Sequence, residues 1–88
     1  RVLFRSMMLR IPIEMQPLAY EMESAVVVEW LVELGAQVIK GDPLVVVETE
    51  KAQVEMEALD TGVLVEVVSV PGDEVPVGEP IGYLEQDG

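Results

Sequence analysis

Residues 25–50 read AVVVEWLVELGAQVIKGDPLVVVETE, and residues 62–87 read GVLVEVVSVPGDEVPVGEPIGYLEQD. The two stretches align without a gap at a constant offset of 37 residues, and eight of the 26 aligned pairs are identical. The identical pairs include two of glycine and one of proline, residue types that mark turns. Two copies are too few for an open stack, which needs about three or more units to cover its faces. We therefore expect the two copies to close on each other about a two-fold axis.

Each copy is expected to form a strand, a turn, a short strand, a second turn and a third strand. Valine and isoleucine supply 21 residues, and their β-branched side chains fit a pleated strand better than a helix. A helix over residues 21–34 is the competing interpretation, but the aligned segment of the second copy ends in Pro71-Gly72, which argues against it. Turn residues recur every ~8–12 positions, which indicates an all-β sandwich or flattened barrel of about eight antiparallel strands without a substantial helix.

The first strand of the first copy has a two-residue hydrophobic period. Val26, Val28, Trp30 and Val32 are expected to share one face of this strand. Glu29 and Glu33 are expected to lie on the opposite face.

Residues 44–57, LVVVETEKAQVEME, are predicted to form a hairpin with a two-residue tip at Glu50-Lys51. Pairing outward from this tip places Thr49 opposite Ala52, Glu48 opposite Gln53, Val47 opposite Val54, Val46 opposite Glu55 and Val45 opposite Met56. In this register the apolar residues Val45, Val47, Val54 and Met56 share one side, as a half-buried hairpin requires. Glu-Lys lacks the Asn-Gly signature of a type I′ turn, whereas a type I turn accepts most residues.

Composition limits the chemistry that this chain can perform. The 88 residues hold five Lys or Arg against 17 Asp or Glu, a formal charge of −12, with no cysteine and no histidine. One small domain without disulfides is expected. Thiol and imidazole catalysis and tetrahedral zinc sites of Cys and His are excluded. The negative charge also argues against nucleic acid and anionic membrane surfaces as partners.

The first residues are expected to be foreign to the natural protein. Residues 1–6, RVLFRS, match an in-frame translation of a short sequencing adapter, so the gene is expected to begin at Met7 or Met8. The apolar part of this stretch is too short for a secretory signal, and the apolar block at residues 25–28 is interrupted by Glu29. We expect a cytoplasmic bacterial protein.

Lys51 stands out because the chain has only one other lysine, Lys40. Residues 48–52, ETEKA, resemble the ETDKA attachment motif of lipoyl domains, the carriers of 2-oxo acid dehydrogenase complexes. The resemblance continues in residues 28–31 (VEWL), 41–44 (GDPL), 62–64 (GVL) and 75–78 (VPVG), and covers about residues 9–86. It implies a flattened barrel of two four-stranded antiparallel sheets related by a quasi-two-fold axis. The resemblance places a lipoyl domain at residues 7–86 and the start of a linker at residues 87–88.

The resemblance further implies that lipoic acid is joined by an amide to Lys51, with Glu48, Thr49, Glu50 and Ala52 as recognition residues. A swinging arm of this kind carries acyl groups and reducing equivalents, while the domain itself catalyses no reaction and holds no metal. The implied partners are a lipoate ligase or lipoyl/octanoyl transferase, a thiamine-diphosphate-dependent decarboxylase, a dihydrolipoamide acyltransferase core and dihydrolipoamide dehydrogenase. The parent complex would act on a 2-oxo acid or on acetoin.

Some residues depart from the family pattern. Lipoyl domains usually have Asp where Glu50 stands, a glycine within the loop at residues 17–22, and a proline-containing turn in place of residues 60–62. That loop packs near the lipoyl hairpin in similar domains. Glu48, Glu50, Glu55 and Glu57 are expected to cluster around Lys51 as a surface for enzymes with cationic clefts.

Two alternatives share the expected fold. A biotin carrier typically flanks its lysine with methionines in the string AMKM, where this chain has Glu50 and Ala52. An unmodified barrel adaptor would use Lys51 only as a turn residue.

Overall fold

The computed structural model describes residues 8–19 and 21–87. The expected leader, residues 1–6, lies outside the described residues, as does Gly88. The described chain forms eight strands: β1 (Met8–Glu14), β2 (Ser24–Trp30), β3 (Gln37–Val38), β4 (Pro43–Glu48), β5 (Gln53–Glu57), β6 (Gly62–Val67), β7 (Glu74–Pro76) and β8 (Pro80–Asp87). Strand β8 continues to Asp87, so the residue expected to begin a linker belongs to the sheet.

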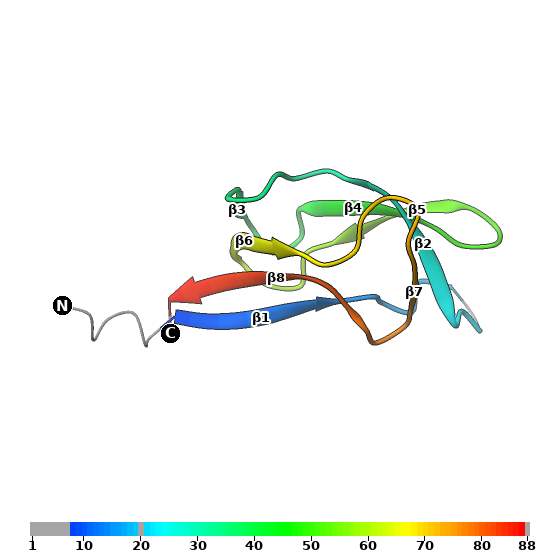
Figure 1. Cartoon of the computed structure of the whole chain (residues 1–88), viewed down its shortest axis with the longest axis horizontal. Coiled ribbons are helices and arrows are strands. Elements are labelled where there is room, and N and C mark those ends of the chain that lie inside the picture. The colour runs from blue at the N-terminus through cyan, green and yellow to red at the C-terminus, as the bar shows by residue number, and fades with distance from the viewer. Residues whose placement is uncertain (1–7, 20, 88) are drawn as a thin grey trace.

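The strands form two four-stranded sheets in which all neighbours run antiparallel. Their strand orders are β1-β8-β6-β3 and β5-β4-β2-β7. Figure 1 shows the two sheets as layers that face one another. The described residues contain no helix, and hence none that could cross a membrane. The predicted all-β sandwich, or flattened barrel, is therefore confirmed.

The sequence repeat corresponds to a quasi-two-fold axis. Strands β3 and β7, and strands β4 and β8, begin 37 residues apart. Backbone contacts between the copies are also duplicated. The Val27 N–H donates to the Asp73 carbonyl at 2.8 Å, and the Leu64 N–H donates to the Ala36 carbonyl at 3.0 Å. Because Val27 aligns with Leu64 and Ala36 with Asp73 in the repeat, these bonds are equivalent, and the two copies close on each other as predicted.

The β4–β5 hairpin has the predicted register. Val45 lies opposite Met56, Val46 opposite Glu55, Val47 opposite Val54 and Glu48 opposite Gln53. The Thr49 N–H donates to the Ala52 carbonyl at 2.9 Å, which continues the pairing to the tip. Val45, Val47 and Met56 are buried, Val54 is half-buried, and Glu48, Gln53 and Glu55 are exposed. A shift of one residue would bury the charged set, so burial of the valines fixes the register.

The predicted inward face of residues 26–32 is wrong in its first half. Val28 is a bulge residue, because Val27 pairs with Val47 while Glu29 pairs with the next residue, Val46. Ala25 and Val27 are buried before the bulge, whereas Trp30 and Val32 pack against the core after it. An extra residue on one strand reverses the alternation. The bulge thereby keeps Glu29 exposed.

The second copy contains the same irregularity. Leu64 pairs with Leu84 and Glu66 pairs with Tyr83, so Val65 is unpaired. Val65 aligns with Val28 in the repeat. Both bulges therefore follow the quasi-two-fold axis.

The core fills the space between the two sheets with residues from both copies. The Trp30 indole N–H donates to the Ser69 carbonyl at 2.8 Å, which anchors the largest side chain of the chain. No described buried side-chain nitrogen or oxygen lacks a hydrogen-bond partner. The buried hydrophobic residues are Ile13, Met15, Ala25, Val27, Val38, Leu44, Val45, Val47, Met56, Ala58, Leu64, Val75, Ile81 and Leu84.

Two glycines of the β6–β8 sheet allow a close approach of neighbouring strands. A Cβ atom at Gly82 would lie 2.7 Å from the Glu66 carbonyl oxygen and 3.2 Å from the Trp30 ring. A Cβ atom at Gly62 would lie 2.8 Å from the Glu85 carbonyl oxygen. Backbone would have to move at either site, so larger residues should cost stability.

We expect Gly82→Ala to lower the free energy of unfolding by about 1–3 kcal/mol, because the added methyl group overpacks the sheet. Urea denaturation measures this loss. Gln53→Ala, at an exposed position of the edge strand β5, is the control and should change stability by less than about 0.5 kcal/mol. A Gly82→Ala variant as stable as the parent would contradict the close approach.

The loop between β1 and β2 contains one strained residue. Glu21 has φ of 59°, in the left-handed region that disfavours residues other than glycine. The domains that this chain resembles usually carry a glycine in this loop. Glu21 therefore adopts a glycine-like conformation without the freedom of a glycine.

We expect Glu21→Gly to be more stable than Glu21→Ala by about 0.5–1 kcal/mol, because both variants lose the side chain but only glycine relieves the left-handed conformation. Thermal and urea unfolding of the two purified variants measure the difference. Equal stability would show that the positive φ carries no cost.

Candidate functional site

Lys51 lies at the tip of the β4–β5 hairpin, at one end of the molecule (Figure 1). The residue is exposed and forms no ion pair with any described residue. Met8 and Asp87 pair with each other at the opposite end, so both described ends of the chain lie far from Lys51. Glu50 aligns with Asp87 in the repeat. The quasi-two-fold axis thus relates the hairpin tip to the ends of β1 and β8.

The tip is a tight turn held by Thr49. Its hydroxyl accepts hydrogen bonds from the Lys51 N–H at 3.3 Å and the Ala52 N–H at 3.2 Å, and donates to the Ala52 carbonyl at 3.1 Å. Glu21 is the only described residue other than glycine with a positive φ, so Glu50 and Lys51 lie outside the left-handed region. A type I′ turn is therefore excluded, because it requires a positive φ at both central residues.

The predicted recognition residues surround the lysine because they are contiguous in the hairpin. Glu48, Glu50 and Ala52 are exposed, while Thr49 is half-buried. Glu48 ends the buried strand β4 and points its side chain away from the core face of Val47. Lys51 is therefore presented on a short rigid support, with an acidic residue immediately before it.

The predicted carboxylate cluster is partly wrong. Glu48 and Glu50 line a groove beside Lys51, but Glu55 and Glu57 do not. Glu57 pairs with Pro43 at the far end of β5. Six residues of extended chain correspond to roughly 20 Å. Glu57 is exposed, but it lies at the end of β5 that is farthest from the tip.

Other acidic residues take the place of Glu55 and Glu57. The groove beside Lys51 has a volume of about 820 Å³ and is also lined by Glu21, Glu23 and Glu74. Glu74 arrives from the second copy, because its strand pairs with β2 at Val26. The Ser24 hydroxyl donates to its carboxylate at 2.7 Å. No local sequence signal connects Glu74 with Lys51, whereas the family resemblance predicts that the loop containing Glu21 lies near the hairpin.

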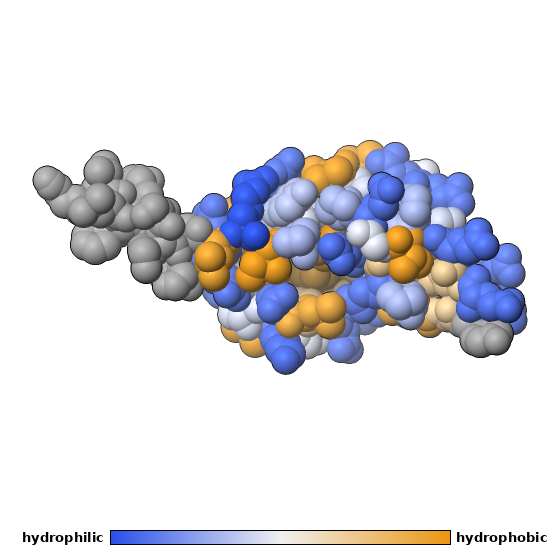
Figure 2. All heavy atoms as spheres, turned by 90° about the horizontal axis from the view of Figure 1, so that it is seen from below, coloured by the Kyte–Doolittle hydropathy of each residue, from blue (hydrophilic) through white to orange (hydrophobic). Residues whose placement is uncertain are grey.

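This end of the molecule is strongly acidic. Figure 2 shows hydrophilic residues gathered at the end of the molecule where the hairpin and the loop before β2 lie. The two other described cations lie elsewhere. Arg10 forms an ion pair with Glu66 and stacks 4.7 Å from the centre of the Tyr83 ring. The Lys40 N–H bonds to the Thr61 hydroxyl at the end where β3 pairs with β6.

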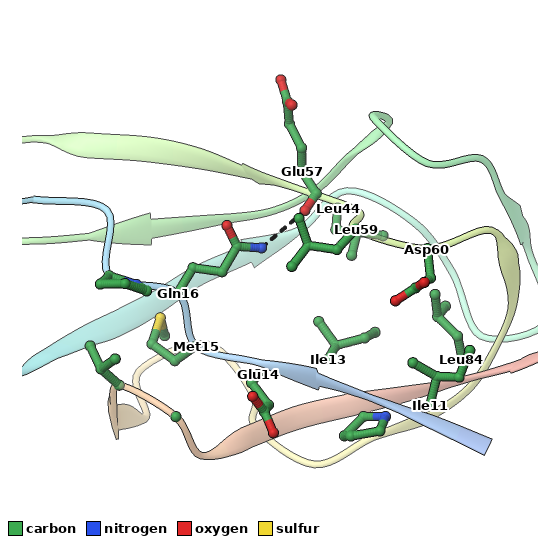
Figure 3. Close-up of a pocket in the computed structure, with 14 residues that line it drawn as sticks. Ile11, Ile13, Glu14, Met15, Gln16, Leu44, Glu57, Leu59, Asp60 and Leu84 are labelled. Carbon is green, nitrogen blue, oxygen red and sulfur yellow. Dashed lines mark hydrogen bonds between the residues drawn. The ribbon is translucent and has the colours of Figure 1, made fainter.

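A second hollow lies between the two sheets, away from Lys51 (Figure 3). Its volume is about 260 Å³, and Ile13, Met15 and Leu44 contribute to its apolar lining. The Gln16 amide donates to the Glu57 carbonyl at 3.2 Å across one side. No predicted attachment or recognition residue lines this hollow. It lies along the seam between β1 and the connection from β5 to β6.

The site fits a covalently attached group. Attachment requires an amine that a modifying enzyme can reach, and the exposed Lys51 side chain has no ion-pair partner among the described residues. The described residues contain no group of three or more carboxylates placed to hold a metal ion. The features assembled at this end are a hydrogen-bonded turn, an exposed amine and surrounding acids.

Comparisons with known proteins identify relatives of the chain. The Biotin_lipoyl family, described as "Biotin-requiring enzyme", matches residues 13–84. The pyruvate dehydrogenase complex protein X component of Saccharomyces cerevisiae is 41% identical over 72% of this chain. The dihydrolipoyllysine-residue succinyltransferase component of the 2-oxoglutarate dehydrogenase complex of Bacillus subtilis is 38% identical over 84% of this chain. The chain spans only 16% and 18% of these two relatives.

Solved structures show the same architecture. The lipoyl domain of the 2-oxoglutarate dehydrogenase complex from Azotobacter vinelandii has a TM-score of 0.69 and 31% identity, covering 89% of this chain and 99% of that domain. A multi-domain long-chain acyl-CoA carboxylase has a TM-score of 0.73 and 28% identity, covering 90% of this chain and 7% of the carboxylase. The chain therefore belongs to the family of biotinyl and lipoyl attachment domains.

Proposed function

We propose that Lys51 carries lipoic acid in amide linkage and that the domain serves as a mobile carrier within a 2-oxo acid dehydrogenase complex. The observation that carries this proposal is an exposed lysine without an ion-pair partner among the described residues, at the tip of a paired hairpin within the string ETEKA. A carrier must present its group to several active sites in turn. A tight turn at the end of two paired strands provides that presentation.

The chain contributes position and charge, and the attached group contributes the reactive atoms. When bound, the dithiolane of lipoic acid supplies the sulfur chemistry that a chain without cysteine lacks. Strands β4 and β5 support the tip that carries Lys51, with Val47 buried and paired with the half-buried Val54. No described side chain forms an ion pair with the amine. The domain itself makes and breaks no bonds in this proposal.

We prefer lipoate to biotin as the attached group because of the residues that flank the lysine. The structural neighbours include a lipoyl domain and part of a long-chain acyl-CoA carboxylase, with similar TM-scores of 0.69 and 0.73. The fold therefore does not distinguish them. Glu50 and Ala52 stand where biotin carriers typically have methionines, and an acid before the lysine is the pattern of lipoyl domains.

The proposed partners follow from the relatives, several of which are named components of 2-oxo acid dehydrogenase complexes. A lipoate ligase or lipoyl/octanoyl transferase would modify Lys51. A thiamine-diphosphate-dependent decarboxylase, an acyltransferase core and dihydrolipoamide dehydrogenase would then use the arm. We place this carrier at residues 7–87, because Asp87 still pairs within the sheet, and in a bacterial cytoplasmic complex.

We expect one lipoyl group to be added when the domain is incubated with lipoate, ATP and a lipoate ligase, because Lys51 is accessible. Intact-mass spectrometry with peptide mapping measures the adduct. Lys51→Arg should abolish it, since arginine keeps the charge but offers no equivalent amine. Lys40→Arg, which alters the other lysine of the chain, is the matched control and should be modified like the parent.

Two results would contradict the proposal. One is an unmodified parent domain under conditions that modify a known lipoyl domain, and the other is an adduct that persists in Lys51→Arg. Parallel incubation with a biotin ligase tests the biotin carrier directly. A biotinyl adduct on Lys51 in place of a lipoyl adduct would assign the domain to the other branch of the family.

The acidic groove further predicts that modifying enzymes approach with a cationic surface. We expect kcat/KM for lipoylation to fall about tenfold as salt rises, because screening removes electrostatic steering. The Debye length shrinks from about 30 Å at 0.01 M to about 8 Å at 0.15 M salt. Initial rates at the two ionic strengths measure the effect.

The Glu48→Gln, Glu50→Gln double variant should show a weaker salt dependence, since both residues line the groove. Glu33→Gln changes an exposed carboxylate outside the groove and should behave like the parent. A rate that is indifferent to salt in the parent domain would refute the electrostatic role.

A further inference from the structure

The hairpin tip has an unusual distribution of hydrogen bonds. The Thr49 N–H donates to the Ala52 carbonyl at 2.9 Å, as expected for a paired strand end. The Ala52 N–H, however, donates to the Thr49 hydroxyl at 3.2 Å, and the Lys51 N–H donates to the same oxygen at 3.3 Å. The side chain of Thr49 therefore takes both backbone donors that follow Glu50.

These contacts use the full bonding capacity of one hydroxyl group. A threonine hydroxyl has one donor and two acceptor lone pairs. Its donor is directed to the Ala52 carbonyl at 3.1 Å, and its acceptors receive the Lys51 and Ala52 N–H groups. No donor or acceptor of the Thr49 hydroxyl remains for a partner protein. A recognition role through this hydroxyl is therefore less consistent with the contacts than a role within the turn.

The other residues at the tip do not perform this role. Glu50, Lys51 and Ala52 are exposed, and none has a side-chain hydrogen bond within the described structure. The turn also lacks glycine or asparagine, which stabilise many hairpin turns through their own backbone preferences. Among the residues that the structure describes, Thr49 is thus the only one whose side chain ties the backbone of Lys51 to the end of the paired strands.

We propose that Thr49 is a positioning residue, whose hydroxyl sets the direction in which Lys51 leaves the hairpin and so its fit to the modifying enzyme. This inference rests on the proposed lipoylation of Lys51 and adds a residue that controls its efficiency. Without the hydroxyl, the two N–H groups turn to water and the tip samples several conformations. A misplaced amine meets the activated lipoyl group less often in a reactive geometry.

Thr49→Val removes the hydroxyl at nearly constant shape, and Thr49→Ser retains it. We expect kcat/KM for lipoylation of Thr49→Val to fall about tenfold, mainly through kcat, because binding by the surrounding acids is kept. Thr49→Ser should stay within about twofold of the parent. Initial rates with lipoate, ATP and a lipoate ligase measure both parameters.

Thr61→Val is a matched control at the opposite end of the molecule. The Thr61 hydroxyl also accepts a hydrogen bond from a lysine N–H, that of Lys40, at 2.9 Å. Its removal should leave lipoylation of Lys51 unchanged. Circular dichroism melts of all variants show whether a lower rate reflects loss of the fold, and Thr49→Ala provides a second hydroxyl-free variant if the valine form does not fold.

Hydrogen exchange at the Lys51 and Ala52 amides, followed by NMR, tests the hydroxyl contacts without any modifying enzyme. Exchange should be faster in Thr49→Val and close to the parent in Thr49→Ser. Unchanged exchange in Thr49→Val, or parental lipoylation rates in both hydroxyl-free variants, would overturn the positioning role alone. An unmodified parent domain would instead overturn the proposed function, and with it any role of Thr49 in presenting the lysine.

Discussion

In this small domain, the short strand of each copy pairs with a strand of the other copy and completes its sheet. Strand β3 of the first copy pairs with β6 of the second, and β7 of the second pairs with β2 of the first. Neither copy could satisfy its backbone groups or cover its apolar face alone, because the strands that complete each sheet belong to its mate. A chain of this length has no disulfide to replace such contacts. The reciprocal exchange of strands therefore holds the two copies together.

The same exchange determines how Lys51 is presented. Closing the two copies about an axis places the hairpin tip at one end and the ends of β1 and β8 at the other. The hairpin is anchored by buried Val45, Val47 and Met56, so only its last residues project. The paired bulges at Val28 and Val65 then let each inner strand bury its apolar residues while keeping Glu29 and Glu66 exposed. Rigidity at the base and exposure at the tip arise from one architecture.

The acidic surroundings of the lysine combine local and distant contributions. Glu48 and Glu50 are neighbours in sequence and could be placed from the hairpin pattern alone. Glu74 could not, because it reaches the groove only through the pairing of β7 with β2. The prediction for Glu57 is wrong for the opposite reason, since residues close in sequence can lie far apart along an extended strand. The geometry of the strands therefore explains why Glu57 lies far from Lys51 and why Glu74 lines the groove beside it.

The sequence by itself determined the two-copy organisation, the register of the β4–β5 hairpin and the location of Lys51 at its tip. These features depend on a two-residue hydrophobic period and on turn residues at fixed spacing, both of which are local. Only the tertiary structure decided the bulges, the strand exchange and the acids that face Lys51 across the groove. An extra residue in a strand changes its inward face without altering its composition, and pairing between distant segments leaves no local pattern. The proposed role of Thr49 also depends on the tertiary structure, because the sequence does not show which groups its hydroxyl bonds in the turn.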